Sequence, residues 1–395
     1  MPDSFTATVF VLVEAGSEYE TKNISGLSHF LEHMCFKGTT KRPKTIDIVG
    51  ELDKIGATHN AFTGTEYTGY YAKSDAKHLD KILDVVADLY LNPLLDPKEI
   101  EKEKGVVIEE IGMRADIPQM SAREAFTQLL YGDQPAGWDI AGTKETVVKL
   151  QREDMIVYRE KRYIATQTLV VVAGKFNEPE IIGKIGSLFS NIKTGGRSSK
   201  EPTIENQTSA RILIKQKELD QKHLVLGVSA FNIFDKRRFA LEVLSDILGG
   251  SSSSRLFMKI REELGAAYYI HAEADLSLDH GYLAISSGVG NDKLEIVLKA
   301  ILDEFKNLRD VEVSPDELQN AKDHLVGSTM VELETSQDIS IFYGMQEIVT
   351  GMILTPSDLE EKIRAVTAAE VQAVARDIFK TSNLNLALVG PVKDE

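Results

Sequence analysis

Residues 28–39 read SHFLEHMCFKGT, a segment in which helical spacing brings three polar side chains together. In an α-helix, His29, Glu32 and His33 occupy positions i, i+3 and i+4 and lie on one face. The rest of the helix is apolar, so it is expected to be buried. Two imidazoles and a carboxylate would be costly there without partners. The pattern therefore predicts a metal site, because two histidines one turn apart chelate Zn²⁺ and the carboxylate can reach a water molecule on the metal.

The composition sets limits on the class of protein. At 395 residues, with 43% hydrophobic and 27% charged residues, the chain resembles a soluble globular protein of two or three domains. A formal net charge of −16 argues against nucleic acid or an anionic membrane surface as the main partner. The apolar run at 6–15 is short and has no basic segment before it, so we interpret it as a strand rather than a signal peptide. No apolar run is long enough to span a bilayer, and we expect a cytoplasmic protein.

The order of predicted elements occurs twice along the chain. A strand at 6–14 and the His-bearing helix open the first half, and a strand at 224–230 and a helix at 239–250 open the second. Asp96-Pro97 and Ser314-Pro315 each begin a long helix. Between the halves the sequence is rich in Thr, Gly, Ser and Lys. We therefore expect two homologous α/β domains, residues 1–195 and 210–395, joined by a linker at 196–209.

The second half lacks the metal-binding groups of the first. When the glycines of the two halves are aligned, Leu241, Leu244 and Ser245 stand at the positions of the three polar residues. Only the first domain is therefore expected to bind the metal.

A third ligand can come from the glutamate-rich helix that follows Pro97. Glu103 and Glu110 are two helical turns apart and share a face, whereas Glu109 is turned about 100° away from Glu110. A ligand on this helix could have a supporting carboxylate two turns earlier, which would orient a histidine by accepting its second ring N–H. Such a charged run is otherwise typical of a solvated surface. Spacing alone leaves the choice open.

The order H-x-x-E-H is typical of the inverzincins. With HFLEHMCFKGT, the chain resembles the pitrilysin/insulinase family of zinc peptidases, and most of all its mitochondrial-processing-peptidase-like branch. The resemblance implies two homologous domains of the processing-peptidase/LuxS-like metallohydrolase type, each an α+β unit with a mainly antiparallel sheet flanked by helices, forming a clamshell. Family members usually have a further strand before the first one here. Either the start of the chain is truncated and this strand is missing, or the first sheet has one strand fewer.

The resemblance implies a role for each polar residue of the first half. His29, His33 and Glu110, which stands 77 residues after His33, bind one Zn²⁺ per chain. Glu32 is the general base that takes a proton from the metal-bound water. Glu103 is the supporting carboxylate seven residues before the ligand.

Substrate contacts are also implied by the resemblance. A strand at the edge of the first domain's sheet pairs with the substrate backbone by strand addition. Its residue Asn60 lies beside the catalytic water. In the second half, Arg261 and Tyr268 hold the substrate carbonyl and stabilise the developing oxyanion. Tyr269, on the opposite face of its strand, is the alternative to Tyr268. The edge-strand residues are Asn60, Ala61, Phe62 and Thr63.

Together these residues predict a zinc metalloendopeptidase that cleaves peptides or unfolded segments held extended in an interdomain cavity. The family expectation is a homodimer, or a heterodimer with a homologous subunit. The alternative is a catalytically silent or partner-dependent subunit with a binding or scaffold role. The complete ligand set and Glu32 favour the enzyme, and Arg261 and Tyr268 in the same chain favour self-sufficiency.

Overall fold

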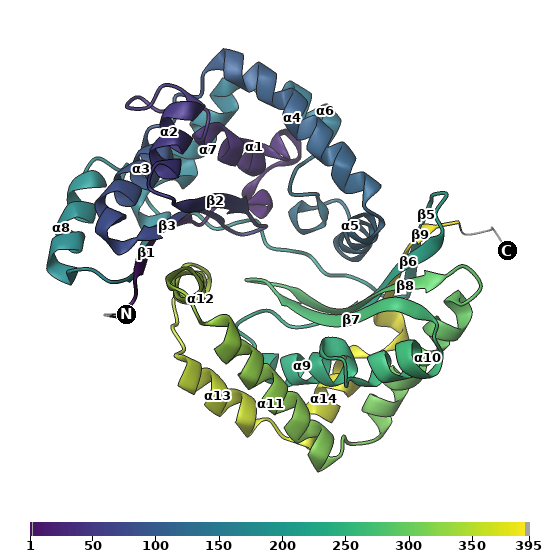
Figure 1. The fold of residues 1–395 in the computed structure, drawn as a ribbon. Helices are drawn as coiled ribbons and strands as arrows, with labels where there is room; N and C mark the ends of the chain where they lie inside the picture. Colours follow the sequence, from purple (N-terminus) through teal and green to yellow (C-terminus); the bar gives the residue numbers. More distant parts are fainter. Residues whose placement is uncertain (2, 392–395) are drawn as a thin grey trace. The chain divides into compact units, whose positions relative to one another are not determined.

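The computed structural model of the chain describes residue 1 and residues 3–391. It divides into two compact units, each a mixture of helices and sheet as expected (Figure 1). Neither unit is continuous in sequence, unlike the predicted domains 1–195 and 210–395. Unit 1 comprises Met1–Gly112, Trp138–Glu201 and Glu332–Ile353, and unit 2 comprises Met113–Gly137, Pro202–Val331 and the chain from Leu354 onward.

The sheet of unit 1 is antiparallel throughout and has the order β2-β3-β1-β4. The inner strand β1 has the mostly apolar sequence TATVFVLV, as expected of a strand that is buried on both faces. Val9, Val11 and Val13 face the core that contains the His-bearing helix, and Phe10 and Leu12 face a second core. The strands are β1 (Thr6–Val13), β2 (Thr58–Thr63), β3 (Thr68–Asp75) and β4 (Thr168–Gly174).

The helices of unit 1 follow the signals in the sequence. Asp96 caps the long helix as predicted, since its side chain accepts the Lys98 N–H at 2.7 Å. The helix that follows His78 buries its apolar face, including Ile82, Leu83 and Val86. The helices are α1 (Leu27–Cys35), α2 (Thr45–Asp53), α3 (Leu79–Leu91), α4 (Pro97–Asp116, from Met113 on in unit 2), α6 (Lys144–Lys149), α7 (Arg152–Arg162) and α8 (Glu178–Leu188).

The sheet of unit 2 confirms the expected mainly antiparallel arrangement. Its order is β5-β9-β6-β8-β7, and β5 pairs in parallel with β9 while the other pairs are antiparallel. Within the described residues it has five strands against four in unit 1. The strands are β5 (Arg211–Gln216), β6 (Gln221–Ser229), β7 (Ala267–Leu276), β8 (Gly281–Gly290) and β9 (Leu384–Gly390).

The main core of unit 2 lies between this sheet and a layer of helices. The helix predicted at 239–250 is α-helical to Ser245 and continues as a π-helical turn over Asp246–Gly250. The other helices are α10 (Leu294–Asp310), α11 (Pro315–Glu332), α13 (Pro356–Ala365) and α14 (Ala368–Ile378), and α9 is Arg238–Ser245.

Each sheet is covered on its second face by a helix from the other half of the sequence. In unit 1, α12 (Ser336–Thr350) packs on β1 and β4, and the Ser336 hydroxyl lies 2.9 Å from that of Thr8. In unit 2, α5 (Pro118–Tyr131) packs on β6 and β9. A Cβ at Gly227 would lie 2.7 Å from the Phe126 ring, so the glycine permits this close approach. This exchange explains why the units are discontinuous.

The predicted linker at 196–209 is tied to both units. Arg197 Nε donates to Glu14 Oε2 at 2.6 Å, and Arg162 donates to the Ser198 carbonyl in unit 1. On the other side, Asn385 of unit 2 donates to the Gln207 side chain at 2.8 Å. The segment therefore lacks regular structure but is held along its length.

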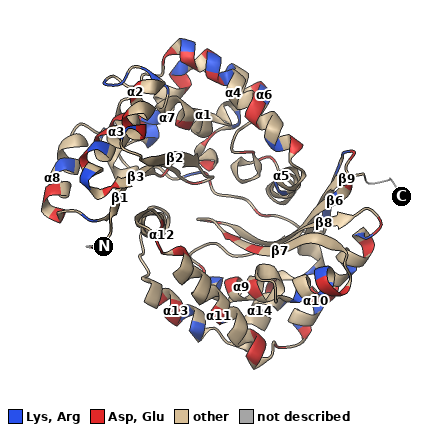
Figure 2. Ribbon diagram, in the orientation of Figure 1, with Lys and Arg blue, Asp and Glu red and all other residues tan. Residues whose placement is uncertain are grey.

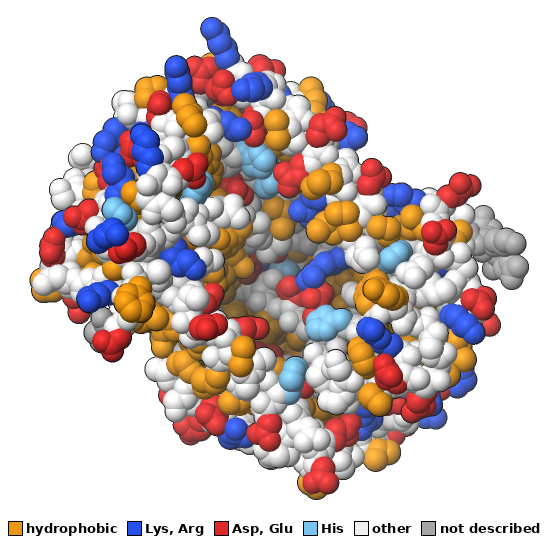
Figure 3. All heavy atoms as spheres, viewed as in Figure 1, with side chains coloured by type: hydrophobic (Ala, Val, Ile, Leu, Met, Phe, Trp, Pro, Cys, Tyr) orange, Lys and Arg blue, Asp and Glu red, His pale blue; other side chains and the backbone are white. Residues whose placement is uncertain are grey.

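Acidic and basic residues are interspersed along the helices of both units (Figure 2). On the face drawn in Figure 3, neither sign of charge forms a large continuous field. Among the helices that the structure describes, none combines the length and the apolar composition that crossing a membrane requires.

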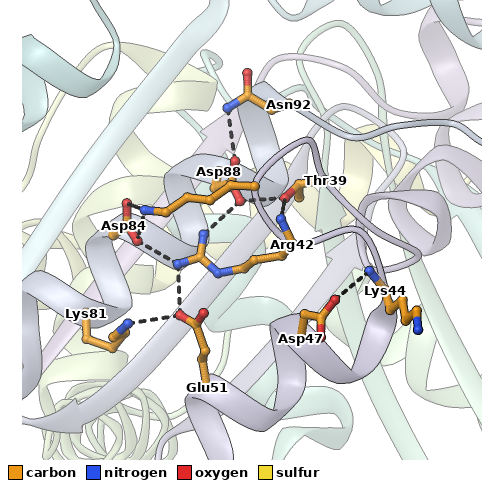
Figure 4. Close-up of polar contacts among 10 residues, drawn as sticks. Thr39, Arg42, Lys44, Asp47, Glu51, Lys81, Asp84, Asp88 and Asn92 are labelled. Carbon is orange, nitrogen blue, oxygen red and sulfur yellow. Dashed lines mark hydrogen bonds and ion pairs between the residues drawn. The ribbon is translucent and has the colours of Figure 1, made fainter.

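A buried arginine holds the loop after α1 against α3 (Figure 4). The Arg42 side chain is only 2% exposed, and its guanidinium donates to Asp84 at 2.6 Å, Asp88 at 2.7 Å and Glu51 at 2.9 Å. Burial by itself raises the pKa of Asp84, but hydrogen bonds from Lys41 and Arg42 lower this pKa overall. The cluster connects α2, α3 and the loop.

Replacing Arg42 by methionine is expected to lower the free energy of unfolding by about 3–5 kcal/mol, because Asp88 would be left buried without its cation. Chemical denaturation at pH 7 measures this. Lys41→Met is the matched control, since the Lys41 side chain is 57% exposed, and its expected cost is at most about 1 kcal/mol. Equal losses of unfolding free energy in Arg42→Met and Lys41→Met would contradict the role of Arg42 as the cation that compensates Asp88.

Arg42→Met should also change how the free energy of unfolding depends on acid pH. A carboxyl whose pKa is depressed by folding contributes stability above its unfolded pKa, about 3.9 for Asp, and this is lost as the pH falls through the folded pKa. Between pH 5 and pH 2.5 the wild type should therefore lose more stability than Arg42→Met.

Candidate metal centre

Helix α1 presents its polar face as predicted. It begins after Gly26, whose φ of +93° favours glycine, and it runs from Leu27 to Cys35. Leu27, Phe30, Leu31 and Met34 are fully buried in the core of unit 1.

Two histidines of α1 and one glutamate of α4 converge. Glu110 Oε1 lies 3.6 Å from His29 Nε2, and Glu110 Oε2 lies 3.5 Å from His33 Nε2. The two imidazole centroids are 4.7 Å apart and their planes are steeply inclined to each other. The three ligand atoms of the group all lie within 4.8 Å of one another.

These distances fit a zinc ion. Zn–N and Zn–O bonds of about 2.0–2.2 Å at tetrahedral angles place neighbouring ligand atoms about 3.4 Å apart. The two His–Glu separations of 3.5 and 3.6 Å are close to that value. Three protein ligands of this type are the set found in catalytic zinc sites, which keep a fourth position open. The residues present therefore fit the group.

Glu103 supports one of the histidines. Its Oε1 lies 3.0 Å from His33 Nδ1, so that His33 Nε2 is left to face Glu110. Its Oε2 forms an ion pair with Lys37 Nζ at 2.7 Å. Burial raises the pKa of Glu103, but the hydrogen bonds from His33 and Lys37 lower it overall. The supporting carboxylate is thus held in its charged form.

Charge around His33 has a corresponding effect. Burial lowers the pKa of this imidazole, while the hydrogen bond to Glu103 and the charges of Glu32 and Glu110 raise it on balance. A metal would replace the proton that these carboxylates otherwise favour.

Glu32 lies on the same face of α1 as the two histidines. Burial raises the pKa of its carboxyl group, and the Thr63 hydroxyl, which donates to Glu32 Oε2 at 2.8 Å, opposes that shift. Thr63 is the last residue of β2, so the strand fixes the position of the carboxylate. The arrangement suits a group that takes up and releases a proton.

The predicted edge-strand residues are divided between two faces. Among the described residues β2 pairs on one side only, with β3, so its other side is an edge. Ala61 and Thr63 face α1, whereas Phe62 packs against Phe10 in the second core. Alternation places the exposed Asn60 on the same face as Phe62, away from α1.

Arg261 and Tyr268 lie in unit 2. Tyr268 is the extra residue of a bulge in edge strand β7 and is 76% exposed. A bulge re-aims a side chain, and here Arg261 Cζ lies 6.0 Å from the Tyr268 ring centre. Tyr269 instead stacks on His223 and lies 3.1 Å from its Nδ1. Of the two tyrosines, Tyr268 is the accessible one.

Models of two families match the chain over most of its length. Residues 2–144 match "Insulinase (Peptidase family M16)", and residues 149–325 match "Peptidase M16 inactive domain". The chain is also 33% identical over 390 residues to a Bacillus subtilis protein named "Uncharacterized zinc protease YmxG", with 99% of this chain and 94% of the relative covered. The chain belongs to the insulinase (M16) family of peptidases.

Other relatives carry the same kind of name. A Streptomyces coelicolor protein named "Uncharacterized zinc protease SCO5738" is 31% identical over 401 residues, covering 100% of this chain and 87% of the relative. The family and these names support zinc peptidase as the class of activity. Residues 149–325 match a domain model described as inactive, and the absence of metal ligands from the second half stays a prediction.

Solved structures share the fold. A protease from Helicobacter pylori gives a TM-score of 0.92 at 22% identity, covering 99% of this chain and 94% of that one. A putative M16-like peptidase from Alicyclobacillus acidocaldarius gives 0.86 at 19% identity, covering 99% and 94%. These likenesses confirm the predicted fold, while the closer relation to the processing-peptidase branch stays a prediction.

Two contacts that support the polar face of α1 were not predicted from the sequence. Lys37 stands one turn after His33, and this i+4 spacing was the available signal for its contact with Glu103. The hydrogen bond from Thr63 to Glu32 had no such signal, because it joins a strand to a helix.

Proposed function

We propose that this protein is a zinc metalloendopeptidase that hydrolyses peptides or unfolded segments bound in an extended conformation. The observation that supports it most directly is the convergence of His29, His33 and Glu110 with Glu32 on the same helix face. When bound there, zinc would activate a water molecule and polarise the scissile carbonyl.

Glu32 is the general base of this proposal. Its carboxylate would take the proton of the attacking water and later deliver it to the leaving amine nitrogen. The Thr63 hydroxyl, 2.8 Å away, would hold the carboxylate during both transfers. Glu103 would keep His33 oriented through its Nδ1.

Substrate binding would use the unpaired edge of β2. Backbone groups at an edge accept an extended chain as an additional strand, which reads conformation more than sequence. Asn60 would contact the substrate from the outer face of that strand. Arg261 and Tyr268 would donate to the carbonyl oxygen as negative charge develops there. The proposal includes the family's dimeric assembly, with either a second copy or a homologous subunit.

Chelation tests this function. Purified protein should cleave a quenched basic peptide, lose activity with a chelator and regain it when zinc is added back. This is expected because the proposed activation of water depends on the metal that the three ligands hold. The control omits zinc from the add-back. Zinc bound in a 1:1 ratio without hydrolysis would instead support the binding or scaffold role.

A further inference from the structure

The N-terminus of α1 lacks an ordinary side-chain cap. Its N-cap residue is Gly26, which offers no side chain, and a Cβ there would lie 2.5 Å from the Ala141 carbonyl oxygen. The first N–H groups of a helix need acceptors when they are buried. The backbone therefore requires glycine at a position where Ser, Thr, Asp or Asn would normally supply the acceptor.

A carboxylate from outside the helix takes over this function. Glu20 Oε2 accepts the Gly26 N–H at 2.7 Å, and Glu20 Oε1 accepts the Ser28 N–H at 2.6 Å. The Glu20 residue is only 4% exposed. Burial raises the pKa of Glu20 to about 8, and the hydrogen bonds from Ser28 and Gly26 oppose that shift. Each oxygen of the group accepts one N–H of the first turn, so the two hydrogen bonds hold the start of the helix.

The segment that carries Glu20 is itself fixed to α1. The Ser28 hydroxyl lies 2.8 Å from the Tyr158 hydroxyl of α7. The Tyr158 hydroxyl in turn donates to the Gly16 carbonyl at 3.2 Å. Residues 16–20 and the first turn of α1 are thus joined by two independent connections. The next residue after Ser28 is His29.

We propose that Glu20 is a positioning residue of the metal centre, which fixes the first turn of α1 and thereby the approach of His29 to Glu110. His33 has its own support, since Glu103 holds its Nδ1 at 3.0 Å. His29 lies in the first turn, so its position depends directly on the cap. The inference rests on the proposed metal site and does not depend on peptide hydrolysis.

Zinc affinity provides the test, measured by competition with a chromophoric chelator on the full chain. Glu20→Ala is expected to weaken zinc binding about 10- to 100-fold, the range typical of supporting groups around metal ligands. Glu20→Gln keeps the size of the side chain and one acceptor oxygen. Its zinc affinity should therefore lie between those of the wild type and Glu20→Ala. Visible absorption of Co²⁺ in the site, which reports ligand geometry, should change in both variants.

A matched control separates positioning from general stability. Ser336 is fully buried and holds α12 to β1 through Thr8, so Ser336→Ala lowers stability in unit 1 without touching α1. Its zinc affinity should equal that of the wild type. The proposal is overturned if Ser336→Ala weakens zinc binding as much as Glu20→Ala does, or if Glu20→Ala binds zinc within twofold of the wild type.

Two further outcomes are distinct. If Glu20→Ala does not fold, Glu20→Gln carries the same comparison. If the wild type itself binds no zinc, the proposed function fails before the variants are compared. A wild type that binds zinc but does not cleave peptides still allows the positioning of His29 to be measured.

Discussion

Glu32→Gln is expected to reduce peptide hydrolysis by a factor of about 10²–10⁴ or to abolish it, with zinc still bound. Glutamine has the same size and its amide oxygen can still accept the Thr63 hydroxyl, which now lies 2.8 Å from Glu32 Oε2. It cannot take a proton at neutral pH. The substitution therefore removes proton transfer and leaves the shape of the site and the three ligands unchanged.

The measurement is kcat for a quenched peptide together with metal content per chain. Glu101→Gln on the exposed surface of α4 removes the same charge away from the site and should keep wild-type turnover. Turnover in Glu32→Gln close to that of Glu101→Gln would exclude Glu32 as the general base. Loss of zinc would show instead that Glu32 maintains the site.

Glu110→Gln is expected to weaken zinc binding about 10²- to 10³-fold. Apparent zinc affinities of about 10–16 kcal/mol for four-ligand sites correspond to roughly 2.5–4 kcal/mol per ligand. Glu110 supplies the only carboxylate of the ligand group, and it lies 3.5–3.6 Å from both imidazoles. A neutral amide would remove the charge that compensates the metal.

The neighbouring residue provides the control. Glu109 is exposed and turned away from the site, so Glu109→Gln should bind zinc like the wild type. Competition titration measures both variants at one pH, since proton release accompanies binding. Equal affinities in the two variants would mean that Glu110 is not a ligand and that the third ligand lies elsewhere.

Local rules predicted the arrangement of polar residues on α1 correctly. The i, i+3, i+4 spacing places His29, Glu32 and His33 on one helix face in any context, because helix geometry is set within one turn. The cap at Asp96-Pro97 and the buried strand Thr6–Val13 depend on equally local preferences. The choice of Glu110 over other glutamates came from the family resemblance, and the structure brings this residue to the histidines.

Other features depended on contacts between distant parts of the chain. A strand with apolar residues on both faces indicates that two layers cover it, but it does not say which helix supplies the second layer. That α12 covers β1, and α5 covers β6 and β9, is decided by shape, including the space above Gly227. The domain boundaries predicted from the sequence missed this exchange for that reason.

The sequence by itself determined the repeated order of elements, the polar face of α1 and the absence of equivalent ligands in the second half. Only the tertiary structure decided that Glu20 caps α1, that Thr63 holds Glu32 and that a bulge exposes Tyr268. Periodicity along a chain reports which face a residue occupies. It contains no information about which distant side chain meets that face, since that depends on how the completed layers pack.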